Sequence, residues 1–288
     1  MAAVVGVERV ACLLGTEDPA ALRAAILEPE AAGVVHLPVV VEQVLDRVDV
    51  GLLTGDDGRP PTVASINAEA GVHHVVSEAG LLRAGTRAAH ATMLAHPYYE
   101  LRYGARGLTW AVGDSSWLLG HTELTTAQAL HQVLWLSRLL AVRGMPSWLM
   151  EQHLDSLTQH LEEAGYDPGV LPEVAQALRD QRAPFVDDAL MADAASWVAD
   201  AVEAPPAPQA GWLVAAAEAD VLTGLISSST PVLEWFTDPV RTSAHDAAAL
   251  RDIGRKVLDA AGSPHQPRRI VSPEERHDWA YWPPAGRT

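Results

Sequence analysis

A long apolar segment that ends at a glycine–proline corner is the feature that most constrains the fold of this chain. Residues 126–143 place leucine, valine and other apolar side chains around most of the circumference that a helix would have. A helix that is apolar nearly all round is typical of the centre of a helical core. We expect Thr125 or Thr126 to cap its start, Gly144 to stop it, and Pro146 to begin the next helix. The segment therefore predicts a core of packed helices.

The composition supports the same fold class. The chain has 288 residues, of which 48% are hydrophobic. A folded chain of this size buries roughly 75% of the surface that its unfolded form exposes, so we expect a sizeable core in one large or two modest domains. Alanine and leucine are abundant, and both favour helix. We therefore predict an all-α protein.

The remaining helices and the domain boundaries follow from periodicity, caps and breaks. Beyond 126–143, we expect helices at 16–28, 37–48, 98–119, 147–164, 171–181, 186–202, 212–226 and 243–260, and a short one ending at Thr237. Residues 64–95 form either one long or one broken helix, and the valine-rich start of 37–48 could also be a short strand. The Ala-Pro-Pro-Ala-Pro stretch at 204–208 is the best linker candidate. We divide the chain into an N-terminal helical extension (1–60), a central helical domain (64–203), C-terminal helices (209–261) and an extended tail (262–288).

The tail is rich in proline, arginine and tryptophan and has no helical or strand periodicity. It is either an arm extended over a neighbouring surface or a disordered segment. Trp279, Tyr281 and Trp282 are unfavourable in water, so they indicate docking onto another surface, in the same chain or in a partner.

Charge and cysteine content exclude several classes of partner and compartment. The formal net charge is −17, whereas a non-specific nucleic-acid binder needs a basic stripe and an anionic membrane surface repels an acidic protein. The apolar N-terminus is interrupted by Glu8 and Arg9, and we expect neither a signal peptide nor a membrane anchor. Cys12 is the only cysteine, so we expect no disulfide framework and a cytoplasmic location.

One face of the segment 126–143 combines polar and aromatic side chains. Gln128, His131, Trp135 and Arg138 align, because residues three and four apart share a helix face. The stripe either lines a pocket, where His131 and Arg138 would contact an anionic or polar ligand, or forms an ordinary half-exposed helix edge.

Tryptophans in the same region could complete such a pocket. Large aromatic side chains either line a cavity or fill the core, and Trp117 and Trp148 flank the apolar segment on either side. The candidate ligand-binding residues are Trp117, His131, Trp135, Arg138 and Trp148.

The twelve histidines invite a search for a metal site, but their spacing does not show one. No His-Glu-x-x-His motif occurs, and the only Glu-x-x-His pair runs from Glu274 to His277 in the tail. A site assembled in space from His90, His153 and Asp114 stays open, with surface histidines as the alternative. We therefore predict no metal site, and name no catalytic residue.

Residues 98–160 combine several short motifs: Tyr103-Gly104-x-Arg106-Gly107, Asp114, Val133-x-Trp135-Leu136 and the corner Arg143-Gly144-Met145-Pro146. With these motifs the block resembles the non-heme globin-like domains of bacterial sensory and regulatory proteins. In many heme globins the proximal histidine lies about two turns before such a corner, where this chain has no histidine between Leu136 and Ala141. The resemblance implies a globin-like helical core, with additional helices at both ends, that does not bind heme in the usual way.

Three classes of function follow from these observations. The leading one is a non-catalytic cytoplasmic protein with a regulatory or ligand-sensing role, which binds a small apolar or amphipathic molecule or a protein partner, including a second copy in a homodimer. The second is a heme or non-heme iron oxygenase with an atypical ligand, His90, His131 or His153. The third is a structural component of an assembly that uses the tail as an arm.

Overall fold

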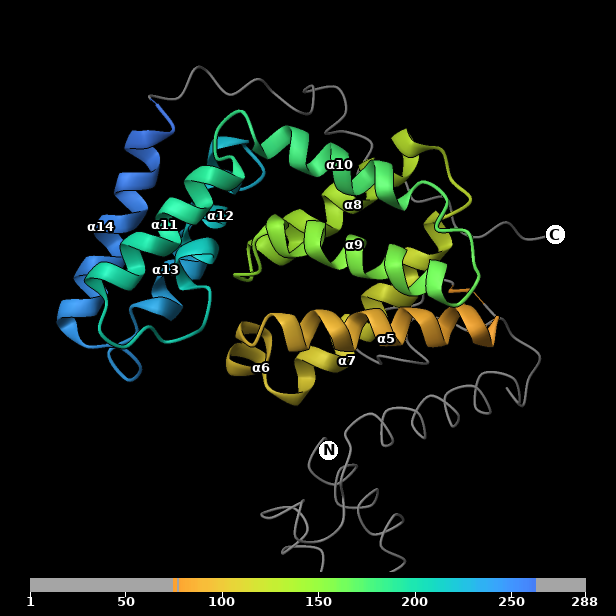
Figure 1. The fold of residues 1–288 in the computed structure, drawn as a ribbon, viewed down its shortest axis with the longest axis horizontal. Helices are drawn as coiled ribbons and strands as arrows, with labels where there is room; N and C mark the ends of the chain where they lie inside the picture. Colours follow the sequence, from red (N-terminus) through yellow and green to blue (C-terminus); the bar gives the residue numbers. More distant parts are fainter. Residues whose placement is uncertain (1–74, 77, 263–288) are drawn as a thin grey trace, which may run out of the picture. The chain divides into compact units, whose positions relative to one another are not determined.

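The computed structural model describes residues 75, 76 and 78–262, and every regular element in these residues is a helix (Figure 1). The prediction of an all-α fold is therefore confirmed for this part of the chain. The predicted extension at 1–60 and nearly all of the predicted tail at 262–288 lie outside the described residues. The resemblance to a globin-like core and the predicted domain boundaries stay predictions. Within the described ranges, no helix is long and apolar enough to span a bilayer.

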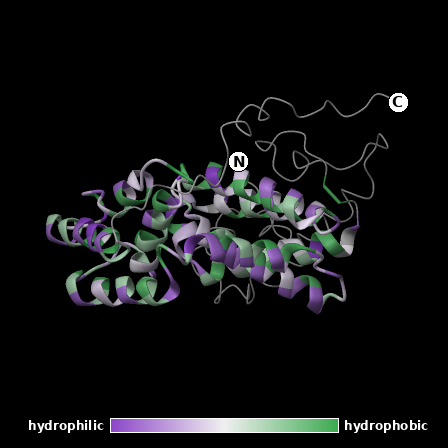
Figure 2. Ribbon diagram, turned by 90° about the horizontal axis from the view of Figure 1, so that it is seen from above, coloured by the Kyte–Doolittle hydropathy of each residue, from purple (hydrophilic) through white to green (hydrophobic). Residues whose placement is uncertain are grey.

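The described helices are α5 (Ala79–Ala95), α6 (Tyr98–Tyr103), α7 (Ala105–Leu118), the 3-10 helix η1 (Leu119–His121), α8 (Thr126–Ala141), α9 (Ser147–Glu163), α10 (Leu171–Arg182), α11 (Asp188–Ala201), α12 (Ala210–Leu222), α13 (Thr230–Phe236) and α14 (Ala244–Ala260). Apolar and polar residues alternate along most of them (Figure 2), as expected for helices that bury one side. After residue 126 these bounds agree with the predicted ranges to within two residues, except that α12 ends at Leu222, four residues before the predicted end at Ile226.

The helices form two compact units. The first contains α5, most of α6, α7, η1 and residues 159–168, and the second contains α8, most of α9 and all helices from α10 onward. In the first unit α5 packs against α7 and η1. A Cβ atom at Gly85 would lie only 3.0 Å from Leu119 Cδ1, so a glycine at this position permits the close approach.

One predicted helix is wrong in a specific place. The range 98–119 was expected to be continuous, but the structure divides it into α6, α7 and η1. The first break is at Gly104, whose φ of 58° lies in the left-handed region. Glycine has no Cβ penalty there, and the residue separates α6 from α7.

In the second unit, α8 begins and ends as its local sequence dictates. Thr125 is the N-cap, and its side chain and that of Gln128 form a capping box. At the other end Gly144, with φ 91°, donates its N–H to Ala141 O at 2.9 Å, and Met145 donates to Leu140 O at 3.0 Å. This pair of bonds is the Schellman pattern. The regular α-helix ends at Ala141, two residues before the predicted end, and the Schellman turn carries the chain to the predicted stop at Gly144.

Helix α12 is the most enclosed helix of the second unit. Its residues are buried on nearly every side, and it packs against α11, α13 and α14. The approach of α11 is close enough that a Cβ at Gly211 would lie 2.5 Å from Ala194 O. Two acids, Glu218 and Asp220, are nevertheless buried on this helix.

The proline-rich stretch at 204–208 joins α11 to α12 inside the second unit. A hydrogen bond holds the residue before this stretch in place: the Glu203 N–H donates to Asp246 Oδ1 at 3.0 Å. This backbone bond is the largest of the contributions that lower the pKa of Asp246. The stretch therefore connects two helices that pack on each other.

Candidate functional site

The predicted ligand-binding residues of α8 lie together on its exposed side. His131, Trp135 and Arg138 are all exposed, with Trp135 at 36%, and Gln128 and Val142 extend the same row. We call these five residues the α8 face. Residues on the other side of α8 are buried: Ala129, Val133, Leu136, Ser137 and Ala141. Of the two interpretations of this stripe, the exposed helix surface fits the structure better than the pocket wall.

The charge of this surface differs from that of the protein. No aspartate or glutamate occurs from 125 to 144, whereas the chain as a whole carries a formal charge of −17. Arg138 and Arg143 are exposed and supply positive charge, and Val142 is 51% exposed beside them. The α8 face thus presents aromatic, aliphatic and cationic groups together.

Trp148 does not belong to this surface. It is 6% exposed, and its ring packs against His96 at 5.2 Å and Trp212 at 5.6 Å between centroids. His96 Nδ1 lies 2.9 Å from Gln209 Oε1, and burial lowers the pKa of His96. A neutral imidazole that donates to the amide oxygen fits this arrangement. Trp148 is a core residue of the second unit.

Trp117 belongs to the first unit, where its ring contacts that of His121 at 4.2 Å between centroids. Its predicted grouping with the residues of α8 stays a prediction. The structure therefore brings together three of the five predicted site residues, His131, Trp135 and Arg138.

The histidines considered as metal ligands are distributed over different helices. His90 is half-buried on α5, His131 is exposed on α8, and His153 is buried on α9. Among residues 75, 76 and 78–262, no group of three or more histidine, cysteine, aspartate or glutamate side chains could hold a metal ion. The geometry of the described residues thus adds no support for the iron-oxygenase alternative.

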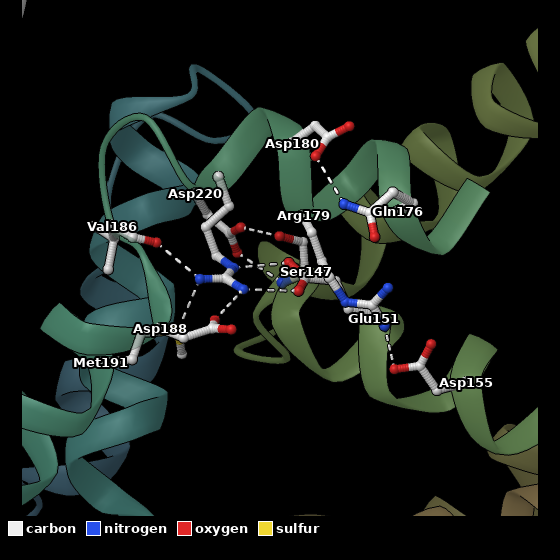
Figure 3. A network of polar contacts seen from close by, with 11 residues as sticks. Ser147, Glu151, Asp155, Gln176, Arg179, Asp180, Val186, Asp188, Met191 and Asp220 are labelled. Carbon is white, nitrogen blue, oxygen red and sulfur yellow. Dashed lines mark hydrogen bonds and ion pairs between the residues drawn. The ribbon is translucent and has the colours of Figure 1, made fainter. Parts of the chain in front are cut away.

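A buried ionic network in the second unit was not predicted from the sequence. Arg182, the last residue of α10, makes two hydrogen bonds to the Glu151 carboxylate of α9, at 2.9 and 3.0 Å. Its Nη1 donates to Val186 O at 2.8 Å and lies 3.1 Å from Met191 Sδ, and its Nη2 donates to Asp188 at 2.8 Å. Figure 3 shows these groups converging from the ends of several helices.

The Arg182–Glu151 pair is almost inaccessible to water. The side chains of Arg182 and Glu151 are 5% and 1% exposed, whereas that of Asp188 is 74% exposed. Burial raises the pKa of Glu151, and the adjacent guanidinium of Arg182 opposes this rise. An ion pair in such surroundings is tolerated only when its polar atoms are satisfied.

Asp220 of α12 forms the second part of the network. It accepts the backbone N–H of Ser147 at 2.9 Å and also the Ser147 hydroxyl. Ser147 is the first residue of α9, whose leading N–H groups have no partner within the helix. Asp220 therefore satisfies a helix start that follows Pro146. Burial raises its pKa to about 7, against the opposing effect of the Ser147 bonds.

The network is chemically closed. A guanidinium has five N–H donors, and the five contacts of Arg182 go to Glu151, Val186, Met191 and Asp188. No donor of Arg182 is left for a ligand, so the arrangement braces α9, α10, α11 and α12. A second enclosed acid, Glu218, accepts from Ser229 at 2.8 Å, and burial raises its pKa.

One signal could have pointed to these residues. Glu218 and Asp220 interrupt an otherwise apolar run in 210–222, and a charge in such a run indicates a buried polar contact. The partners lie 73 residues away for Asp220 and 31 for Glu151 with Arg182. Helical periodicity carries no information about pairs at these separations.

Comparison with known proteins adds no relative: no family model, no curated protein and no solved structure matches the chain.

Proposed function

We propose that this protein is a non-catalytic regulatory protein that acts by binding a protein partner through the α8 face. The observation that carries the proposal is the composition of that face: Trp135 and Val142 are exposed beside Arg138, on an acid-free helix of an acidic chain. Tryptophan and arginine are the residue types most enriched among the energetically dominant contacts of protein interfaces. The resemblance of 98–160 to domains of bacterial regulators points the same way.

The location of the candidate residues favours a macromolecule over a small ligand. Small-molecule sites are concave and bury most of the ligand, whereas His131, Trp135 and Arg138 are exposed on one helix. A protein surface can cover such a row, bury the indole and place carboxylates near the guanidinium. The proposed compartment is a reducing cytoplasm, on the ground that Cys12 is the only cysteine.

The experiment begins with crosslinking in cells. Ala127 is exposed one turn before His131, so a photoreactive p-benzoylphenylalanine at 127 samples the α8 face without removing any of its residues. The same group at Ala192, exposed on α11, is the control. A protein captured from 127 and not from 192 is then purified, and its dissociation constant for the full chain is measured.

Variants decide whether the captured protein binds as proposed. We expect Trp135→Ala to weaken binding roughly 30-fold or more, as for a central interface residue. Arg138→Glu should weaken it as well, whereas Arg251→Glu, at an exposed arginine of α14, should not. Equal affinities for wild type and Trp135→Ala, or no specific capture from 127, would overturn the proposal.

A spectrum of the purified full chain, with metal analysis of the same sample, tests the proposal against the iron-dependent alternative. We expect no Soret band and no stoichiometric iron. Either signal would replace this proposal with the iron-dependent alternative and direct attention to His90, His131 and His153.

A further inference from the structure

The acid-free surface of α8 has a complementary segment within the same chain. Residues 273–282 read Pro-Glu-Glu-Arg-His-Asp-Trp-Ala-Tyr-Trp. With three acids and one arginine, the formal charge of this segment is −2 (−3 + 1). We call it the acidic-aromatic segment, and it lies outside the described residues. We propose that it binds the α8 face of its own chain, and so occupies the surface at which the partner is proposed to bind.

Charge and side-chain type match on the two sides. The α8 face offers Arg138 and His131, and Arg143 lies close by, with no acid from 125 to 144. The acidic-aromatic segment offers Glu274, Glu275 and Asp278. Opposite charges favour the correct encounter and orientation of two surfaces more than they add affinity.

The aromatic residues supply the apolar part of the contact. Trp279, Tyr281 and Trp282 follow directly after the acids. Trp135 at 36% and Val142 at 51% exposure are the apolar groups available on the α8 face. Burying indole and phenol rings against them removes apolar area from water on both sides.

The connection is long enough. Helix α14 ends at Ala260 and belongs to the same unit as α8. The ten residues from 263 to 272 span up to roughly 33–36 Å when extended. A folded unit of some 130 residues has a radius of gyration of about 14 Å, which corresponds to a diameter of about 36 Å, so the connection is about as long as the unit is wide.

Because the acidic-aromatic segment and the α8 face belong to one chain, even a weak contact between them can be highly populated. A short connection that is long enough to span two binding sites gives an effective local concentration in the millimolar range. A segment with even millimolar affinity would then occupy the α8 face for much of the time. A partner would have to displace the acidic-aromatic segment, so the segment would compete with the partner for the α8 face. This regulatory role rests on the proposed function, whereas the contact between the segment and the α8 face does not.

The test uses the purified full chain without any partner. With p-benzoylphenylalanine at Ala127, irradiation followed by peptide mass spectrometry should give crosslinks to residues 273–282, and the same group at Ala192 should not. An equal mixture of ¹⁵N-labelled and unlabelled chains distinguishes contacts within one chain from contacts between chains. We expect only crosslinks within a chain.

Charge reversal and rescue test the pairing itself. Arg138→Glu should lower the crosslink yield roughly 2–5-fold, as expected for loss of an exposed ion pair, and Asp278→Arg in the same chain should restore it. Trp279→Ala together with Trp282→Ala should lower the yield about tenfold. Arg251→Glu should leave it unchanged.

Three results would overturn the inference: no crosslink from 127 to 273–282, crosslinks only between labelled and unlabelled chains, or an unchanged yield in the double tryptophan variant. Its failure is distinct from failure of the proposed function. Loss of partner binding in Trp135→Ala without any tail crosslink would refute the internal contact alone. A tail crosslink in the full chain, with no partner captured even when Trp279→Ala and Trp282→Ala clear the α8 face, would refute the partner alone.

Discussion

Two arginines of the second unit lie in opposite environments, one buried and one exposed to solvent. Arg182 is enclosed, with its guanidinium bound by Glu151 and three further residues. Arg138 is exposed on the α8 face, beside Trp135. A charge removed from water must have its polar atoms satisfied by the protein, so all donors of Arg182 are used in contacts that stabilise the fold. Arg138 keeps its capacity to recognise something outside it.

The comparison also shows that a raised pKa and an interaction surface are different signals. Asp220 and Glu151 have raised pKa values, a property often found at functional sites. Here each belongs to a network whose partners come from the chain itself, so the perturbed pKa values indicate a structural brace. The α8 face, by contrast, is identified as an interaction surface by its exposure and composition.

The largest expected effect is the loss of one member of the buried pair. Arg182→Met should lower the free energy of unfolding by roughly 3–5 kcal/mol, because Glu151 would remain buried without its counter-charge. Urea unfolding followed by circular dichroism measures this change. Adding Glu151→Leu should recover much of the loss, since two apolar side chains can replace a buried ion pair. A loss below 1 kcal/mol in Arg182→Met would show that the pair is not a brace.

A smaller effect is expected from the titration of Asp220. Its pKa is raised from 3.8 to about 7 in the folded state, so the folded protein holds a proton that the unfolded chain releases. The stability from this proton is complete below pH 3.8 and is lost as the pH rises through about 7. The change from pH 5 to pH 8 amounts to a few kcal/mol, at about 1.4 kcal/mol for each pKa unit.

Asp220→Asn isolates that contribution. Asparagine has no proton to exchange in this range, so the variant should lose the decline in stability between pH 5 and pH 8 that wild type shows. Unfolding free energies at four or five pH values in one buffer system provide the comparison. Parallel pH profiles for the two proteins would assign the decline to other groups.

The smallest effect on stability is expected at the exposed arginine. Arg138→Glu should change the unfolding free energy by no more than about 0.5 kcal/mol, as is usual for surface substitutions. Its effect should be confined to binding, and partner affinity should fall less steeply with added salt, because an attractive charge has been replaced by a repulsive one. A loss of stability as large as that of Arg182→Met would show that Arg138 also stabilises the fold, contrary to this expectation.

The sequence predicted what is determined locally and missed what is determined by contacts between distant residues. The start of α8 at Thr125 and its stop near Gly144 depend on neighbouring residues, and both were expected. The alignment of His131 with Arg138 also follows from helical spacing. The bond from Ser147 to Asp220 depends on how α9 meets α12, and no periodic pattern encodes that meeting.

Exposure was harder to predict than alignment. An apolar helix can bury any of its sides, so the leucines and valines of 126–143 did not reveal which side faces water. The same ambiguity placed Trp148 with the candidate ligand site, although it packs in the core with His96 and Trp212. Gly104 broke a helix that its neighbours would have continued.

The enclosure of α12 has a consequence for the motions of the second unit. Its residues from Leu213 to Asp220 are all buried, and the backbone of α11 lies against Gly211. Solvent deuterons can reach the peptide N–H groups of these residues only when the surrounding helices separate. The hydrogen-exchange rates of the slowest amides of α12 therefore report how often the whole unit opens. A molecule bound to the outside of α8 would slow this exchange by stabilising the closed unit, without any contact to α12.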